Sequence, residues 1–225
     1  MKPEIASVVP DRRSEPRARI AGSSGAYDTR FRRLLGKQAW ESLPGAVRRR
    51  FSKRVEGQRV VIYPGVIKQA QFSRAGRILA QLCRLIGGPL PLSSDCDVPA
   101  AVSVSEDCVS GGQCWTRVYG RRSGFPQVIH SAKRFAGPSG LEEHLGRGIG
   151  MALEAVAVDG GLEFRSDHYF VAVFGRRLKL PRWLEPGRTV VRHIDKGEGS
   201  FVFSLALEHK WLGEMVYQEG LFEDA

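Results

Sequence analysis

The sequence contains no asparagine, no long apolar run and no recognisable catalytic or metal-binding motif. The missing asparagine removes one common source of capping, turn and catalytic amide groups. No run of about 18 or more apolar residues occurs, so we expect no membrane-spanning helix. There is no P-loop, no G-x-S-x-G elbow and no H-E-x-x-H pair, and the glycines of residues 146–150 lack dinucleotide-binding spacing. The sequence therefore indicates neither a cofactor nor an enzyme class.

Cysteine is also scarce. Cys83, Cys96, Cys108 and Cys114 form no C-x-x-C pair and have no histidines at zinc-ligand offsets. Residues 1–20 contain no apolar h-region, so we expect no secretory signal and a cytoplasmic location. In that reducing compartment the cysteines would be free thiols.

Positive charge is in excess, with a net charge of +10. Residues 1–60 contain 15 Lys and Arg against 6 Asp and Glu, whereas residues 61–225 contain 19 against 18. The excess therefore belongs to the N-terminal part, where weak contact with nucleic acid or an anionic surface is one interpretation. The interspersed acidic residues favour the other interpretation, a solvated leader.

Composition divides the chain at residue 26. Residues 1–26 are rich in Pro, Arg, Ser and Gly and are predicted to form a disordered basic leader, followed by a single domain over 27–225. Helical spacing of apolar residues predicts helices near 31–35, over 44–55 and over 73–87. Ser73 is the expected N-cap of the last helix, and Gly87-Gly88 its expected end.

After Pro91 the apolar pattern changes to a period of two, which is typical of strands. Gly-containing turns at 111–112, 159–161 and 197–199 are short enough to make neighbouring strands antiparallel. The predicted strands are 57–67, 98–106, 112–120, 127–135, 149–158, 161–174, 188–196, 199–209 and 213–222. We therefore expect an α+β fold: a large curved antiparallel sheet or half-barrel of about nine strands, with N-terminal helices packed on it.

Strand phase places several polar residues on faces that also carry aromatic and aliphatic side chains. Burying such a group without a partner costs about 1–3 kcal/mol, so each must be paired or must line a wet cavity. Each of these residues, considered alone, is more simply interpreted as a core or rim residue whose polar group is hydrogen-bonded. Considered together, they predict a pocket with a polar floor. The candidate ligand-binding residues are Arg117, His168, His209, Gln218, Trp115 and Tyr119.

A catalytic histidine cannot be chosen from sequence neighbours, because adjacent residues on a strand point to opposite faces. A histidine–carboxylate pair would have to join different strands. The combinations to test are Glu143 or Glu154 with His168 or His209.

Scattered motifs over about residues 28–224 resemble one bacterial family. They are Phe31-Arg32-Arg33-Leu34-Leu35-Gly36, Ala39-Trp40, Leu43-Pro44, Val47-Arg48-Arg49-Arg50-Phe51, Gly88-Pro89-Leu90-Pro91, Trp115-Thr116-Arg117, Glu143 with Gly148-Ile149-Gly150-Met151, Leu180-Pro181-Arg182-Trp183-Leu184, and His209 with Gly213-Glu214, Gln218, Gly220 and Phe222. Together they resemble the family catalogued as domain of unknown function 4166.

That resemblance implies an association rather than an activity. Members of the family occur alone or fused behind a saccharopine-dehydrogenase-like NADP-binding domain, which points to oxidoreductase partners. No catalytic residues come with the family. The chain has His209-Lys210-Trp211-Leu212-Gly213 where members often carry His-Pro before Leu-Gly, so the resemblance does not imply a rigid turn that positions His209.

Three functions remain open at this point. The first is a non-enzymatic module that binds an apolar or lipid-like small molecule with an acidic head group, in a cavity of several hundred cubic ångströms. Arg117 would suit such a head group, because its planar fork pairs with a carboxylate or a phosphate. The second is an interaction domain, which partners an NADP-dependent oxidoreductase or docks its leader on an acidic protein. The third is an enzyme that uses a histidine–carboxylate pair.

Overall fold

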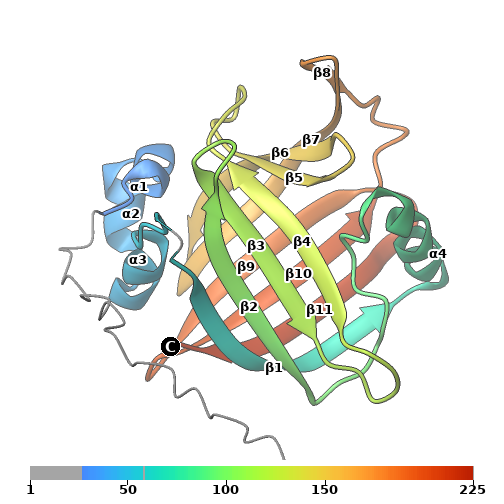
Figure 1. Cartoon of the computed structure of the whole chain (residues 1–225), viewed down its shortest axis with the longest axis horizontal. Helices are drawn as coiled ribbons and strands as arrows, with labels where there is room; N and C mark the ends of the chain where they lie inside the picture. Colours follow the sequence, from blue (N-terminus) through green and yellow to red (C-terminus); the bar gives the residue numbers. More distant parts are fainter. Residues whose placement is uncertain (1–26, 58, 225) are drawn as a thin grey trace, which may run out of the picture.

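A computed structural model of the chain describes residues 27–57 and 59–224. Eleven strands form one antiparallel sheet that curls around a central interior (Figure 1). The strands are β1 (Val61–Phe72), β2 (Val98–Asp107), β3 (Gly112–Tyr119), β4 (Gln127–Arg134), β5 (Glu142–Gly146), β6 (Ile149–Val158), β7 (Gly161–Val173), β8 (Arg176–Lys179), β9 (Arg188–Gly197), β10 (Ser200–His209) and β11 (Gly213–Glu223).

Ten of these strands close into a barrel. Successive strands pair from β1 to β7, β7 then pairs with β9, and the meander continues to β11. The first and last strands also pair, with Gly65 opposite Phe222 and Phe72 opposite Val216, and this pairing completes the ring. The eleventh strand, β8, lies beside the second half of β7 and outside the ring.

The expected α+β fold with an open curved sheet or half-barrel was therefore wrong: the structure is a closed, mostly β barrel. The nine predicted strands are all present, but the prediction lacked β5 and β8, which are only 5 and 4 residues long. Closure depends on the pairing of β1 with β11, the first and the last strand in the sequence. The local alternation of residues predicts where a strand lies, but it does not predict that two strands distant in the sequence pair with each other.

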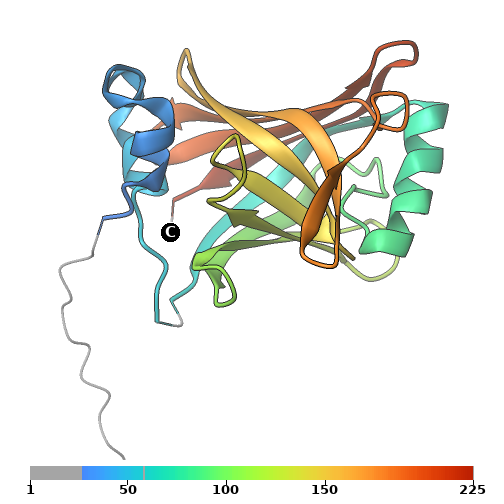
Figure 2. The ribbon, with the colours of Figure 1, turned by 90° about the horizontal axis from the view of Figure 1, so that it is seen from above.

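The helices lie at the two ends of the barrel (Figure 2). Three short helices precede β1, and one helix that continues into a 3₁₀ turn connects β1 to β2. They are α1 (Arg30–Leu35), α2 (Lys37–Ser42), α3 (Gly45–Phe51), α4 (Arg74–Leu82) and η1 (Cys83–Ile86). Among the described residues, no helix has the length and apolar content needed to cross a membrane. The predicted leader, residues 1–26, lies outside the described residues, so the division at residue 27 remains a prediction.

Helices α1–α3 fill their end of the barrel. Phe31 and Phe51 pack edge to face at 5.1 Å, and Phe31 also contacts Phe164 of β7. Arg50 of α3 donates to Asp195 at 2.9 Å and to Asp224 at 2.7 Å, which ties the helix to the ends of β9 and β11.

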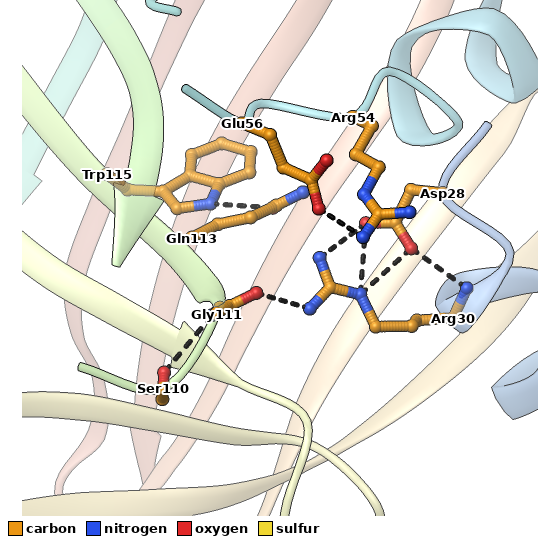
Figure 3. A network of polar contacts seen from close by, with 9 residues as sticks. Asp28, Arg30, Arg54, Glu56, Ser110, Gly111, Gln113 and Trp115 are labelled. Carbon is orange, nitrogen blue, oxygen red and sulfur yellow. Dashed lines mark hydrogen bonds and ion pairs between the residues drawn. The ribbon is translucent and has the colours of Figure 1, made fainter. Parts of the chain in front are cut away.

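A second polar network fastens the residues before and within α1 to the β2–β3 turn. Arg30 donates to the Asp28 carboxylate and to the carbonyl of Gly111, and the Gln113 side chain accepts from the indole of Trp115 (Figure 3). Packing and polar contacts together therefore hold the α1–α3 end shut.

Helix α4 closes the opposite end. Its N-cap is Ser73, as predicted: the side chain accepts from the Gly76 amide at 3.1 Å. Gly76 lies so close to β11 that a Cβ atom there would collide with the Met215 carbonyl. The missing side chain of Gly76 thus sets how closely α4 approaches the barrel.

This contact predicts opposite effects for alanine at two helical glycines. Gly76→Ala should destabilise the protein by about 1–3 kcal/mol, because the methyl group must push α4 away from β11. Gly45→Ala is the matched control, since a Cβ there meets only the Arg49 side chain at 3.5 Å. That variant should be neutral or more stable by up to about 1 kcal/mol. Urea unfolding measures both; equal effects would contradict the packing described for α4.

Candidate functional site

A mainly apolar cavity of about 240 Å³ occupies the barrel interior beneath α4. Its roof combines α4 and η1, the 89–91 segment that follows them, and the connection from β8 to β9. The cavity is smaller than the several hundred cubic ångströms expected. The apolar lining comprises Leu79, Cys83, Ile86, Pro89, Leu90, Pro91, Ile129, Leu145, Ile149, Met151, Leu180, Leu184, Pro186, Val191, Phe203, Leu205 and Leu207.

Charged side chains meet at the side of this cavity, from three neighbouring strands. Arg117 of β3, Ser131 of β4 and Glu143 of β5 line it. Glu143 accepts from the Ser131 hydroxyl at 2.6 Å, from Lys133 at 2.9 Å and from Arg117 at 3.3 Å. Lys133 is 1% exposed and lies against the rings of Trp115 and Phe164.

The cluster stabilises the ionised form of its carboxylate. Burial raises the pKa of Glu143, but Lys133, Arg117 and the hydrogen bond from Ser131 outweigh burial and lower this pKa to about 2. Burial and the neighbouring Arg117 lower the pKa of Lys133, against the opposing pull of Glu143. Two basic side chains thus share a single carboxylate inside the barrel.

Arg117 is held loosely in this cluster. Its two hydrogen bonds, to Ser131 at 3.2 Å and to Glu143 at 3.3 Å, are longer than the roughly 2.7–2.9 Å of tight charge-assisted bonds. A guanidinium has five N–H donors in a planar fork, so Arg117 retains donor capacity at the cavity wall.

Tyr119 adds a neutral donor next to Arg117 on the same face of β3. It lines the cavity, and its hydroxyl has no hydrogen-bond partner within residues 27–57 and 59–224. Burial raises the pKa of Tyr119, so its phenol stays protonated at neutral pH. Across the cavity, the Tyr169 and Thr189 hydroxyls are already bonded to each other at 2.6 Å.

The structure brings together only some of the six predicted site residues. Arg117 and Tyr119 line the main cavity, and Trp115 lies under Lys133, where it lines a second void of about 30 Å³. Gln218 is buried against a void of about 10 Å³ that it shares with Tyr119. Their role in binding a ligand remains a prediction.

His168 and His209 lie elsewhere. Asp167 is an extra residue in β7, since Ala152 pairs with His168 while Leu153 pairs with Ser166. This β-bulge reverses the alternation, so Tyr169 lines the cavity and His168 instead bonds Asp167 at 2.6 Å. His209, at the end of β10, contacts Trp211 in the following turn.

The histidine–carboxylate pairs considered for catalysis do not form in the described residues. Glu143 bonds Arg117, Ser131 and Lys133, and Glu154 is exposed on β6. No group of three or more His, Cys, Asp or Glu side chains in the described part of the chain is placed to hold a metal ion.

Sequence reasoning missed Ser131, Lys133, Tyr169 and Thr189. Ser131 and Lys133 share the inward phase of Ile129 on β4, so the alternation of that strand carried a signal for them. Tyr169 was hidden by the bulge, because nothing in the sequence marks Asp167 as an extra residue. The buried His193 was also missed. Its Nδ1 atom has no partner in the described structure, and burial, with Arg50 nearby, lowers its pKa to about 3.

Residues 43–222 match the family described as Domain of unknown function (DUF4166), which confirms the resemblance. No curated protein and no solved structure matches the chain. The fusion to an NADP-binding domain remains a prediction.

The charge cluster predicts a pH-dependent stability difference. The pKa of Glu143 is depressed in the folded state, so its stabilising contribution is present above pH 4.5 and is lost as the pH falls towards about 2. Glu143→Gln should cost about 3–5 kcal/mol at pH 7, because two buried cations lose their counter-charge. The gap between wild type and variant should shrink by about 3 kcal/mol between pH 4.5 and 2.

Chemical denaturation at several pH values measures this gap. Glu154→Gln is the matched control and should leave stability unchanged at every pH, since Glu154 is exposed. A Glu143→Gln gap that stays constant from pH 7 to 2 would contradict the ionised, shared carboxylate.

Proposed function

Because the chain belongs to the DUF4166 family, whose function is unknown, we propose its function from the cavity: it binds a compact apolar small molecule that carries an acidic head group. Closed barrels that enclose a cavity are a recurrent architecture for ligand binding. The proposed activity is binding, without a chemical step.

The observation that carries the proposal is the excess of basic over acidic side chains in the buried cluster, of which Arg117 and Glu143 line the cavity. Arg117 and Lys133 are both buried and share the single carboxylate of Glu143. An anionic ligand would supply the second negative charge and would use the spare donors of Arg117. A cationic ligand would meet two like charges in a medium of low dielectric constant, where repulsion is strong.

The distribution of polar groups sets the orientation of the ligand. Its acidic group would lie between the guanidinium of Arg117 and the hydroxyl of Tyr119, both of which are donors. Its apolar part would extend towards the roof, where Leu79, Ile86 and Leu184 supply only hydrocarbon surface. A volume of about 240 Å³ is just below the usual range of roughly 300–1,000 Å³, so the ligand is a compact one.

The other functions lack a comparable observation. The partnership with an oxidoreductase follows from the family resemblance alone, and the catalytic proposal depended on histidine–carboxylate pairs that the described residues do not form. The cytoplasmic location likewise remains a prediction.

Native mass spectrometry of the full chain tests the proposal. The protein is titrated with straight-chain carboxylic acids of increasing length and with the matching primary alcohols. Acids should bind at least about tenfold more tightly, because a hydrogen bond to a charged group contributes about 1.5–3 kcal/mol. The preference should be strongest for short and medium chains, which fit the cavity.

Two variants locate the head group. Arg117→Gln should remove the preference for acids, and Tyr119→Phe should weaken acid binding by about three- to tenfold. Arg33→Gln and Tyr27→Phe are matched controls on exposed residues at the α1–α3 end and should leave binding unchanged. Equal binding of acids and alcohols to the folded wild type would contradict the proposal.

A further inference from the structure

Exposed apolar side chains surround the roof of the cavity. They belong to three segments, residues 74–86 (α4 and η1), 174–188 (β8 and its flanks) and 209–214 (the β10–β11 turn), which we call the docking face. Its large exposed apolar residues are Ile78, Leu82, Leu85, Phe174, Leu178, Trp183, Leu184, Trp211 and Leu212.

The three segments are neighbours in the fold. Gly187 packs against the backbone of Glu208 and His209, and Gly76 packs against Met215 just after the β10–β11 turn. Residues 74–86 and 174–188 both contribute side chains to the cavity lining. Figure 2 shows α4 and the β10–β11 turn at the end of the barrel opposite α1–α3, and in Figure 1 the connection that follows β8 runs down towards α4.

Helix α4 and η1 are apolar on two sides. Leu79, Cys83 and Ile86 line the cavity, whereas Ile78, Leu82 and Leu85, one position earlier in each case, are exposed. The remaining exposed positions include Arg74, Arg77 and Arg84, and residues 73–90 contain no Asp or Glu. Exposed Leu and Ile beside Arg is the pattern of helices that lie in a membrane interface.

The docking face also concentrates positive charge. It contains nine Lys and Arg against two Asp and Glu, whereas the rest of residues 61–225 contains ten against 16. All nine basic residues are exposed, and one of them, Arg177, is bonded to Glu142. The near-neutral barrel is therefore strongly polarised, with its basic side around the cavity roof.

We infer that the docking face binds the surface of an anionic lipid bilayer. Each segment combines exposed apolar residues with basic ones, so hydrocarbon contact and attraction to anionic head groups are available together. Trp183 and Trp211 are the side-chain type enriched at membrane–water interfaces. Docking itself needs no ligand in the cavity.

Docking would also place the cavity roof against the lipid, because the same segments form both. Exchange of the bound molecule with the bilayer would then avoid passage through water. This consequence rests on the proposed function, whereas bilayer binding stands without it.

Tryptophan fluorescence provides a built-in reporter. Trp183 and Trp211 are 72% and 74% exposed, whereas the other two tryptophans, Trp40 and Trp115, are 7% and 6% exposed. Full-length protein is mixed with vesicles of phosphatidylcholine, with or without 30% phosphatidylglycerol (roughly one anionic lipid in three). The phosphatidylglycerol vesicles should shift the emission to the blue and sediment the protein, and added salt should weaken binding.

Variants separate the docking face from the basic N-terminal residues. Arg77→Gln/Arg84→Gln/Arg182→Gln should weaken binding on the order of 100-fold, given the usual contribution of each basic residue near an anionic surface. Leu82→Gln/Leu85→Gln should weaken it by about tenfold or more. Val60→Gln/Val109→Gln, exposed apolar residues at the α1–α3 end, should have no effect. None of these residues lines the main cavity, so native mass spectrometry should show unchanged acid binding.

Two outcomes would overturn the inference. The first is no binding to phosphatidylglycerol vesicles, including the case in which an acidic protein binds the face instead. The second is that the protein sediments with the vesicles but its emission does not shift. In that case the sedimentation would be lost in Arg13→Gln/Arg17→Gln/Arg19→Gln and retained in the docking-face variants. Either outcome leaves the test of acid binding unaffected.

Discussion

The ion pair between Lys133 and Glu143 fixes the shortest strand of the ring. The two residues are cross-strand partners on β4 and β5, and β5 is only five residues long. A slip of β5 by one residue would turn Glu143 to the outer face, while Lys133 of β4 would stay inside. Loss of Glu143 would leave Lys133 and Arg117 without a counter-charge at a site that is almost fully buried. The register of this part of the barrel thus depends on one buried electrostatic contact.

The same contact shapes the site. Because Glu143 bonds Lys133 and Ser131 at short distances and Arg117 at a longer one, the guanidinium is the least constrained member of the cluster. Arg117 also lines the cavity, together with Tyr119 of the same strand. Register, burial and charge therefore combine to present donors at the wall of an otherwise apolar space.

The two ends of the barrel have different characters. At the α1–α3 end, Phe31 and Phe51 fill the interior and Arg50 is neutralised by two aspartates. At the α4 end the interior is hollow, and the surface above it is apolar and basic. The α1–α3 end is filled and its charges are neutralised, whereas the α4 end has a cavity and an excess of basic side chains; this difference is why we propose that the ligand binds at the α4 end.

Much of this architecture could be predicted from the sequence. Alternation located nine strands, and the Ser73 cap together with the helical spacing of apolar residues over 73–87 located α4. The same reasoning placed Arg117 and Tyr119 on an inward face, since β3 alternates without interruption. The reasoning failed where the chain departs from regular geometry. At Asp167 a β-bulge reverses the alternation, so Tyr169 lines the cavity instead of the predicted His168.

Tertiary contacts account for the rest. The pairing of β1 with β11 joins distant segments, so the sequence predicted strands but not their closure into a barrel. The partnership of Glu143 with Lys133 likewise required β5, a strand too short to show alternation.

The central claim is that the buried cluster receives an acidic group. A crystal structure of the protein soaked with a medium-chain carboxylic acid tests it most directly. We predict a carboxylate within about 3 Å of both the Arg117 guanidinium and the Tyr119 hydroxyl, with the hydrocarbon chain towards α4. A chain bound in the opposite direction, or a cavity that holds only water at saturating acid, would contradict the account.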